Sequence, residues 1–206
     1  MKTDGKRPRK QRNREAIISR AAELFLREGF SGTSMAMIAA EVGGSKTTLY
    51  NHFPSKELLF EEVVQLVLTS VIQSVEEVDY RGLDVRAALT AIGTTIFSAA
   101  QSKKSIAVHR LVFFEAQRNG AGARAFLKRG PEVGLRYLRT ALAHFVDQGS
   151  IECRDIDKAA TYFFAMLLYQ HMLYREAGVV KELDRTEIES HVDQVVEDFI
   201  RICPAL

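Results

Sequence analysis

The sequence contains few of the residues that mark specialised protein classes. Tryptophan is absent, and cysteine occurs only twice among 206 residues, as Cys153 and Cys203. These cysteines lie far apart and form no Cys-x-x-Cys or Cys/His pattern, so we expect neither a zinc site nor a disulfide framework. Four prolines and 13 glycines are too few for a low-complexity chain. These absences favour a folded protein in a reduced cytosolic setting.

Long apolar runs are missing as well. The most apolar stretch, residues 159–173, contains Tyr162, Gln170 and His171 and is shorter than the ~20 residues that span a bilayer. No apolar segment of about 7–15 residues follows the basic N-terminus, so we expect no secretory signal. We therefore predict a cytoplasmic protein with no membrane partner, in which residues 159–173 form a helix buried on two sides.

Catalytic signatures are also lacking. The sequence has no Ser/His/Asp order, no HExxH, no GxGxxG and no phosphate-binding loop. His171 and Glu176 share a predicted helix but have no nucleophile at a suitable spacing. His109, near Glu115, could suggest a metal, but the adjacent Arg110 disfavours a cation there. We predict no enzyme activity, no cofactor and no metal.

Positive charge is concentrated at one end of the chain, although the formal net charge is only +2. Residues 1–56 contain 11 Lys and Arg against five Asp and Glu, whereas residues 57–206 contain 17 against 21. The two segments therefore carry net charges of +6 and −4. A basic end favours a polyanion partner. Because seven of these bases lie in residues 1–14, a solvated tail is the alternative.

Apolar spacing predicts helices along the whole chain. Residues 1–11 lack apolar periodicity and are expected to form a mobile arm, followed by a helix from Arg14 to about Glu28 that Gly29 ends. Further helices are predicted at about 34–42, 45–52, 55–78, 84–101, 104–119, 121–148 (broken near Gly130-Pro131), 156–177 and 186–203. No period-2 alternation appears, so we predict an all-α fold of about nine helices.

Residues 33–53 carry the most informative pattern. A short helix leads to Gly43-Gly44, where positive φ costs little without a Cβ, and a second short helix of small polar residues follows. Two short helices across a tight turn fit the DNA major groove. After Pro54, a helix of about 24 residues spans ~36 Å, enough to link this module to a separate body.

These residues resemble the TetR family of transcriptional regulators. The resemblance covers residues 16–59 and is carried by Ala21, Ala22, Leu24, Phe25, Gly29-Phe30, Thr33-Ser34, Ile38-Ala39, Gly43, Ser45-Lys46, Thr48-Leu49-Tyr50, Phe53 and residues 55–59. More loosely, residues 109–112, Glu115-Ala116, Phe126 and Gly149 resemble the AefR-like class of TetR C-terminal domains. One residue departs from the pattern: Gly44 stands where the family usually has Val or Ile, so we expect a locally less stable turn.

The resemblance implies an N-terminal three-helix helix-turn-helix DNA-binding domain over residues 12–56. A long helix joins it to a helical effector-binding and dimerisation domain over residues 57–206. The expected function is that of a ligand-responsive regulator, most often a repressor. It would bind a pseudo-palindromic operator as a homodimer and be released by a small, largely apolar effector.

The residue types indicate how DNA would be bound. Lysine can donate to guanine, and threonine can contact a base edge or a thymine methyl group. Tyr50 and His52 resemble the family's phosphate-contacting positions, and Lys56 lies at a helix N-terminus that favours phosphate. Ser45 and Ser55 could be only N-caps, Leu49 and Phe53 are expected in the core, and the arm could reach the DNA backbone or minor groove. The predicted DNA-binding residues are Thr33, Ser34, Ser45, Lys46, Thr47, Thr48, Tyr50, Asn51, His52 and Lys56.

Two further sets are expected in the body. Aromatic and methionine side chains on central helices can line an apolar effector pocket or simply form core; the candidates are Phe97, His109, Phe113, Phe114, Tyr137, Tyr162, Phe163 and Met166. The last two helices could form a four-helix interface with a twofold copy, or pack within one chain. The candidates for that interface are Phe164, Leu167, Leu168, His171, Val192, Val195, Val196 and Phe199. A DNA-binding protein without a ligand is the alternative function, distinguished by the absence of a closed apolar cavity.

Overall fold

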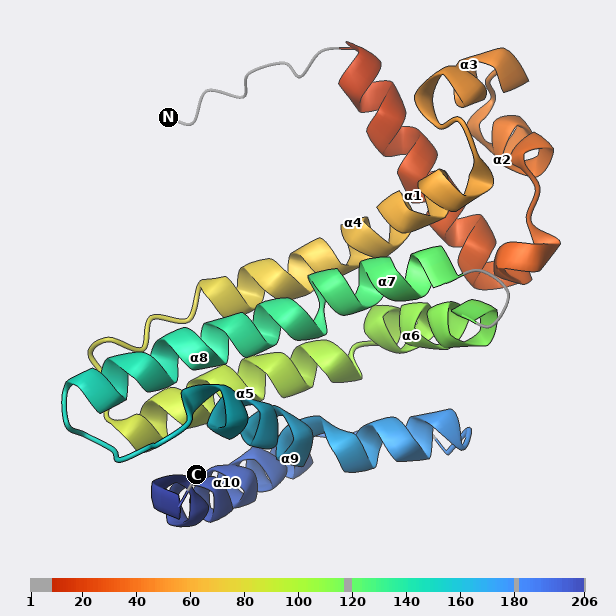
Figure 1. Ribbon diagram of the computed structural model, residues 1–206. Helices are drawn as coiled ribbons and strands as arrows, with labels where there is room; N and C mark the ends of the chain where they lie inside the picture. Colours follow the sequence, from red (N-terminus) through yellow and green to blue (C-terminus); the bar gives the residue numbers. More distant parts are fainter. Residues whose placement is uncertain (1–8, 117–119, 180–181, 206) are drawn as a thin grey trace. The chain divides into compact units, whose positions relative to one another are not determined.

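The computed structural model describes residues 9–116, 120–179 and 182–205, and all regular structure within them is helical (Figure 1). The helices are α1 (Arg9–Gly32), α2 (Met35–Val42), α3 (Lys46–His52), α4 (Lys56–Glu76), α5 (Val85–Gln101), α6 (Lys103–Ala116), α7 (Gly120–Arg129), α8 (Pro131–Asp147), α9 (Ile156–Glu176), α10 (Arg185–Ile202) and the short 3-10 helix η1 (Cys203–Ala205). The predicted all-α class is confirmed. Ten α-helices replace the expected nine because the chain breaks between α7 and α8, at Gly130-Pro131, where proline can begin a helix but not continue one.

The chain divides into two compact units. The first comprises residues up to Val67 together with Ala107–Phe126, and the second comprises Leu68–Ile106 with Leu127–Leu206. Helices α4, α6 and α7 each contribute residues to both units. The domain boundary at residues 56/57 remains a prediction, because the compact units are defined by packing and one of them is discontinuous in sequence.

The first unit places α1 against α2 and α2 against α3. The predicted start of α1 at Arg14 is wrong: the helix already begins at Arg9, so residues 9–11, assigned to an arm, are helical. The expected stop at Gly29 holds, since this residue has a left-handed φ of 75° that interrupts the helical geometry. Phe25 packs against Phe30 and Phe60, with ring centroids 5.7 and 5.2 Å apart, and so joins α1 to α4.

The second unit is built around α5, which packs against α8, α9 and α10. Three of its helices begin at aspartate N-caps, each accepting a backbone N–H of the first turn: Asp84 for α5, Asp155 for α9 and Asp184 for α10. The Glu187 side chain also accepts the Asp184 N–H, which completes a capping box. The apolar stripe of α10 faces inward and is buried by helices of the same chain.

A close approach of α5 and α10 occurs at Gly93. A Cβ added there would lie 3.1 Å from Val192 Cγ1 and 3.3 Å from Phe163 Cζ, and both of those side chains are buried in the core. We expect Gly93→Ala to lower the free energy of unfolding by about 1–3 kcal/mol through overpacking. Gly82→Ala is the matched control, since nothing lies within 4 Å of its Cβ position. Thermal unfolding followed by circular dichroism measures both, and equal stability of the two variants would contradict this packing argument.

His171 of α9 lies in an aromatic cluster with His191 of α10 and Phe97 of α5. The two imidazole centroids are 4.7 Å apart, and each lies within 4.7 Å of the Phe97 ring. Partial burial lowers the pKa of His171, and the charges of His191 and Arg175 lower it further.

This cluster predicts a pH dependence of stability. Between the lowered folded pKa of His171 and its unfolded value of about 6.5, the unfolded chain binds more protons. Stability therefore rises with pH through this window and is lost as pH falls. We expect His171→Gln to flatten the melting temperature between about pH 5 and 7 relative to the parent chain. His52→Gln, in the other unit, is the control. A pH profile unchanged in His171→Gln would rule out this histidine as the source.

Candidate nucleic-acid interface

The turn between α2 and α3 is a Schellman motif. Gly43 adopts a left-handed φ of 71°, its N–H donates to the Ala40 carbonyl (3.2 Å), and the Gly44 N–H donates to the Ala39 carbonyl (3.1 Å). In such a motif the residue at the Gly44 position usually makes an apolar contact back to the helix. Glycine cannot make this contact, which gives a physical reason for the apolar residue that the family pattern has there.

The two glycines of this turn should respond oppositely to alanine. Gly44 lacks a positive φ and has nothing within 4 Å of the place that an alanine methyl group would take, so Gly44→Ala should stabilise the chain by about 0.4–1 kcal/mol. Gly43→Ala should destabilise it by about 1–2 kcal/mol, because its φ is left-handed. Both substitutions add the same methyl group at adjacent residues, and urea unfolding measures the change in stability that each one causes. Shifts of the same sign would contradict the assigned turn.

Helix α3, the second helix of the helix-turn-helix and the one expected to enter the DNA major groove (the recognition helix), has one buried face and one polar face. Ser45 caps it by accepting the Thr48 N–H (3.1 Å), and the Ser45 and Thr48 hydroxyl oxygens are 2.9 Å apart. Leu49 and Phe53 are buried, as expected for core residues. The polar side chains point outward: Ser45, Lys46, Thr47, Thr48, Tyr50 and Asn51 are exposed, and His52 is half-buried.

A shallow hollow of about 460 Å³ lies beside this helix. Five of the predicted DNA-binding residues line it: Thr33, Ser34, Lys46, Tyr50 and Lys56. The other lining residues, which were not predicted from the sequence, are Ser31, Met35 and Ala36. The start of α2 faces it, where Ser34 caps the helix by accepting the Met37 N–H at 3.2 Å. Backbone N–H groups at a helix N-terminus and lysine ammonium groups both favour an anion, so the hollow suits a DNA phosphate.

Two of the predicted DNA contacts have structural partners inside the protein. Thr33 is 1% exposed, and its hydroxyl donates to the Gly29 carbonyl at 2.7 Å. The prediction that its side chain contacts DNA is therefore wrong; it stabilises the end of α1. Lys56 Nζ donates to the carbonyls of Phe30 (2.8 Å) and Thr33 (2.9 Å) and lies 4.2 Å from the centre of the Phe30 ring. It joins α4 to the end of α1, and any phosphate contact would be additional to these bonds.

Arg14 is likewise committed within the fold. Its guanidinium forms an ion pair with Glu62 (2.8 Å) and lies 5.0 Å from the Phe53 ring centroid. Arg14 therefore lies in the packed part of α1, beyond the arm expected over residues 1–11. Residues 9–11 of that arm are helical, and residues 1–8 lie outside the described residues.

The predicted effector-pocket residues do not form one cluster. His109 and Phe113 belong to the first unit, where their rings stack with centroids 4.2 Å apart, and the Phe114 side chain lies outside the described part of the structure. Phe97 and Phe163 are fully buried in the core of the second unit, and the Tyr137 hydroxyl donates to the Val78 carbonyl. Tyr162 is 42% exposed and Met166 is half-buried. Core packing accounts for Phe97 and Phe163.

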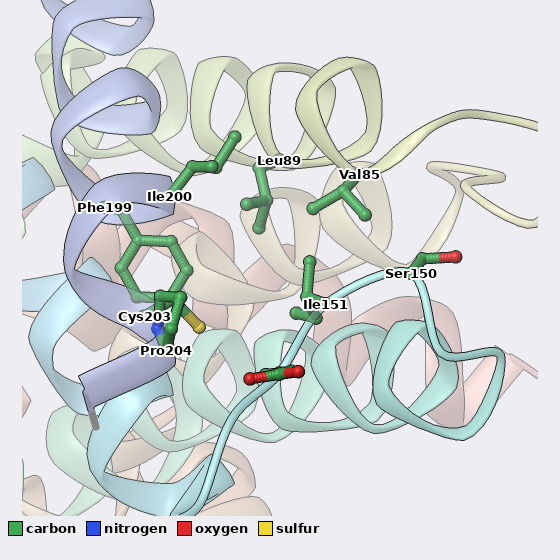
Figure 2. A pocket seen from close by; sticks show the side chains of 9 residues that line it. Val85, Leu89, Ser150, Ile151, Phe199, Ile200, Cys203 and Pro204 are labelled. Carbon is green, nitrogen blue, oxygen red and sulfur yellow. The ribbon is translucent and has the colours of Figure 1, made fainter.

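A cavity of about 270 Å³ lies elsewhere in the second unit (Figure 2). Its walls come from the start of α5, the α8–α9 loop and the end of α10, and none of the predicted pocket residues belongs to them. The lining is Val85, Leu89, Ser150, Ile151, Glu152, Phe199, Ile200, Cys203 and Pro204. These residues are distant in sequence, and no local pattern marks them.

Most of the predicted dimer residues face their own chain. Six of the eight are less than a tenth exposed: Leu167, Leu168, Val192, Val195, Val196 and Phe199. The prediction that these six form a surface for a second subunit is therefore wrong, because neighbouring helices of the same chain cover them. Phe164 and His171 are half-buried.

The outward face of α9 is apolar instead. Tyr162, Tyr169 and Leu173 are 42%, 68% and 54% exposed, and their spacing of i, i+7 and i+11 places them on one stripe, which we call the α9 stripe. Met166 lies between them on the same face. No charged residue occurs from Ala159 to Tyr174. The prediction that residues 159–173 form a helix buried on two sides is therefore wrong for the single chain, which buries one face of this helix and leaves the other exposed.

Other kinds of site are not evident in the described residues. No helix there is long and apolar enough to cross a membrane. Within the same part of the chain, no group of three or more His, Cys, Asp or Glu side chains could hold a metal ion.

Together, a glycine turn between two short helices, an exposed polar recognition helix and a basic hollow beside it define a helix-turn-helix DNA-binding protein with a helical C-terminal body. Residues 17–63 match the family model of bacterial regulatory proteins of the tetR family, and residues 87–202 match that of the AefR-like transcriptional repressor C-terminal domain. The chain belongs to the TetR family of transcriptional regulators, with a C-terminal domain of the AefR-like class. Its family and structural neighbours are regulators, not enzymes.

The individual proteins to which the chain is similar are transcriptional regulators as well. The transcriptional repressor KstR2 of Rhodococcus jostii RHA1 is 33% identical over 96 residues, which is 47% of each chain. The chain thus matches about half the length of this relative. A TetR-family regulator from Mesorhizobium loti MAFF303099 has a TM-score of 0.83 at 28% identity, covering 95% of this chain and 98% of the other. The flavonoid-responsive regulator FrrA has a TM-score of 0.81 at 29% identity, covering 94% and 97%.

Proposed function

We propose that this TetR-family regulator is a repressor that binds a pseudo-palindromic operator as a homodimer and dissociates when a small, largely apolar effector binds. The polar face of α3 carries the proposal: Lys46, Thr47 and Thr48 are exposed at the helix start, while Leu49 fixes the opposite face in the core. In helix-turn-helix proteins the start of the recognition helix contacts base edges.

The proposed contacts divide by chemistry. Lys46, Thr47 and Thr48 would address base edges, because their donors and methyl groups match guanine, adenine or thymine in the major groove. Ser34, Tyr50 and the start of α2 would hold a phosphate in the hollow. Ser45 is first of all the cap of α3. Asn51 and His52 extend the exposed polar face, and phosphate contacts from them would set orientation, not sequence preference.

Dimerisation is proposed to use the α9 stripe. A twofold axis would bring two such stripes together and present two recognition helices to successive half-sites of a palindrome. The stripe is suited to this role because it is apolar, exposed and free of charge along four helical turns.

The effector is proposed to be apolar because the described cavity is lined mainly by Val85, Leu89, Ile151, Phe199 and Ile200 (Figure 2). An effector can weaken DNA binding only by binding more tightly to the conformation with mispositioned recognition helices. KstR2 is named a repressor and FrrA a flavonoid-responsive regulator, so flavonoids belong in the first panel of test compounds.

Binding-site selection from random duplexes tests the proposal directly. A selected pseudo-palindrome, bound more tightly than a scrambled duplex at the same salt concentration, is the expected result. A panel of apolar metabolites is then titrated into the complex, and fluorescence anisotropy reports release. Recovery of no preferred sequence would contradict the operator proposal. Specific binding that no compound reverses would favour the ligand-independent alternative, which the small size of the cavity supports, since ligand pockets usually exceed about 300 Å³.

A further inference from the structure

The two cysteines, 50 residues apart in the sequence, meet in the second unit. Cys153 packs against the part of the core that contains Cys203, the two thiols are neighbours, and both are free. Cys203, at the end of α10, is 2% exposed and belongs to the hydrophobic core, against which the half-buried Cys153 of the α8–α9 loop packs. This proximity is not evident from their distance in the sequence.

Small molecules have a route to this pair. Cys203 lines the 270 Å³ cavity, and its sulfur appears in Figure 2 among the apolar side chains of the wall. Cys153 is the more exposed of the two thiols. A small oxidant can therefore reach Cys153 from the loop side, whereas Cys203 is 2% exposed.

We propose that Cys153 and Cys203 form a redox-reactive dithiol that hydroperoxides convert to an intramolecular disulfide. This modification site does not depend on the proposed operator or effector. It requires only that the two neighbouring sulfur atoms approach to bonding distance.

The chemistry occurs in two balanced steps. The Cys153 sulfur attacks the hydroperoxide O–O bond, giving a Cys153 sulfenic acid and releasing one alcohol, or water when the oxidant is hydrogen peroxide. The Cys203 sulfur then attacks the sulfenic sulfur, an S–S bond forms, and the hydroxyl leaves as water with the Cys203 proton. Two electrons pass from the pair of thiols to the peroxide oxygens.

The environments of the thiols set this order. Burial, together with the neighbouring Cys153, raises the pKa of Cys203 to about 12, so Cys203 remains a thiol at neutral pH. The thiolate is the nucleophile, and a buried, protonated cysteine reacts slowly with oxidants in solution. Cys203 is therefore suited to resolving a sulfenic acid that is already in contact with it, not to attacking peroxide first.

The disulfide would link the α8–α9 loop to the residue that follows α10, and the closed loop would contain both α9 and α10. A cross-link across so long a loop restricts the unfolded chain strongly. The oxidised protein, including α9 and its stripe, would therefore be more resistant to unfolding.

Intact-mass measurement of the full chain after treatment with hydrogen peroxide tests the proposal. We expect a loss of about 2 Da for the two hydrogens, a fall from two titratable thiols to none, and full reversal by dithiothreitol. The oxidised chain should melt about 5–10 °C higher than the reduced chain. Peptide mapping without reduction should recover the Cys153 and Cys203 peptides joined to each other.

Single substitutions distinguish the cysteine that is oxidised first, Cys153, from the cysteine that then forms the disulfide with it, Cys203. Cys203→Ala should leave a Cys153 sulfenic acid that dimedone traps, whereas Cys153→Ala should resist oxidation because its remaining thiol is buried. If either variant folds poorly, the mass and peptide map of the parent chain decide the matter alone. Stable sulfinic acid without cross-linking, a disulfide between two chains, or two persistent thiols would each overturn the proposal.

Discussion

Replacing Lys46 by alanine is expected to weaken operator binding by about 100-fold at fixed salt. Lys46 is exposed at the start of α3 and lines the basic hollow. A lost contact of this kind costs about 1–3 kcal/mol, and a homodimer on a palindrome loses it twice. Since 1.4 kcal/mol corresponds to a factor of ten, a loss of about 1.4 kcal/mol in each of two subunits gives about two orders of magnitude. Fluorescence anisotropy with the selected operator measures the effect.

The companion measurements identify what Lys46 contacts. If it binds a base, affinity for a scrambled duplex changes little; if it binds phosphate, both affinities fall and the salt slope decreases by about 0.9 per subunit. Lys104→Ala removes the same charge from the other compact unit and should change affinity by less than about threefold. Tyr50→Phe removes only a hydroxyl from the hollow and should have a smaller effect than Lys46→Ala. Unchanged operator affinity in both the Lys46 and Tyr50 variants would refute the assigned interface.

The helix-turn-helix could be predicted closely because short-range contacts define it. Ser34 and Ser45 cap helices by accepting N–H groups three residues ahead, and Gly43 supplies a left-handed turn that closes within the preceding helix. The burial of Leu49 and Phe53 follows from helical spacing in the same short segment. Caps, turns and helical spacing depend on residues that are close together in the sequence, so the sequence alone suffices to recognise them.

The predictions that the structure corrects depend on contacts between residues that are far apart in the sequence. Lys56 reaches the carbonyl of Phe30, 26 residues earlier, and Cys203 meets Cys153 across 50 residues. Periodicity showed that α10 has one apolar stripe, but it could not show whether that stripe faces its own chain or a partner. In the structure the stripe packs against α5 and α9, and the exposed apolar stripe lies on α9.

The α9 stripe leads to a second prediction with a large expected effect, on dimerisation. Tyr169→Glu combined with Leu173→Glu is expected to convert the homodimer to monomers at micromolar concentration. Two charges would enter the centre of an apolar contact, where an unpaired carboxylate is strongly unfavourable. Both side chains are more than half exposed in the single chain, so the monomer itself should keep its fold and melting temperature. Sedimentation should show a species near the chain mass of 23.1 kDa instead of twice that value.

Operator affinity should fall together with dimerisation, by at least about 100-fold, because each monomer retains only one half-site's contacts. Leu83→Glu is the matched control: it adds a carboxylate at an apolar residue of 40% exposure in the α4–α5 connection, away from the α9 stripe. The control should remain dimeric and bind the operator normally. If the α9 double variant stayed dimeric with full operator affinity, the stripe would not be the interface. A variant that stayed dimeric but lost the operator would instead show that α9 affects DNA binding without holding the subunits together.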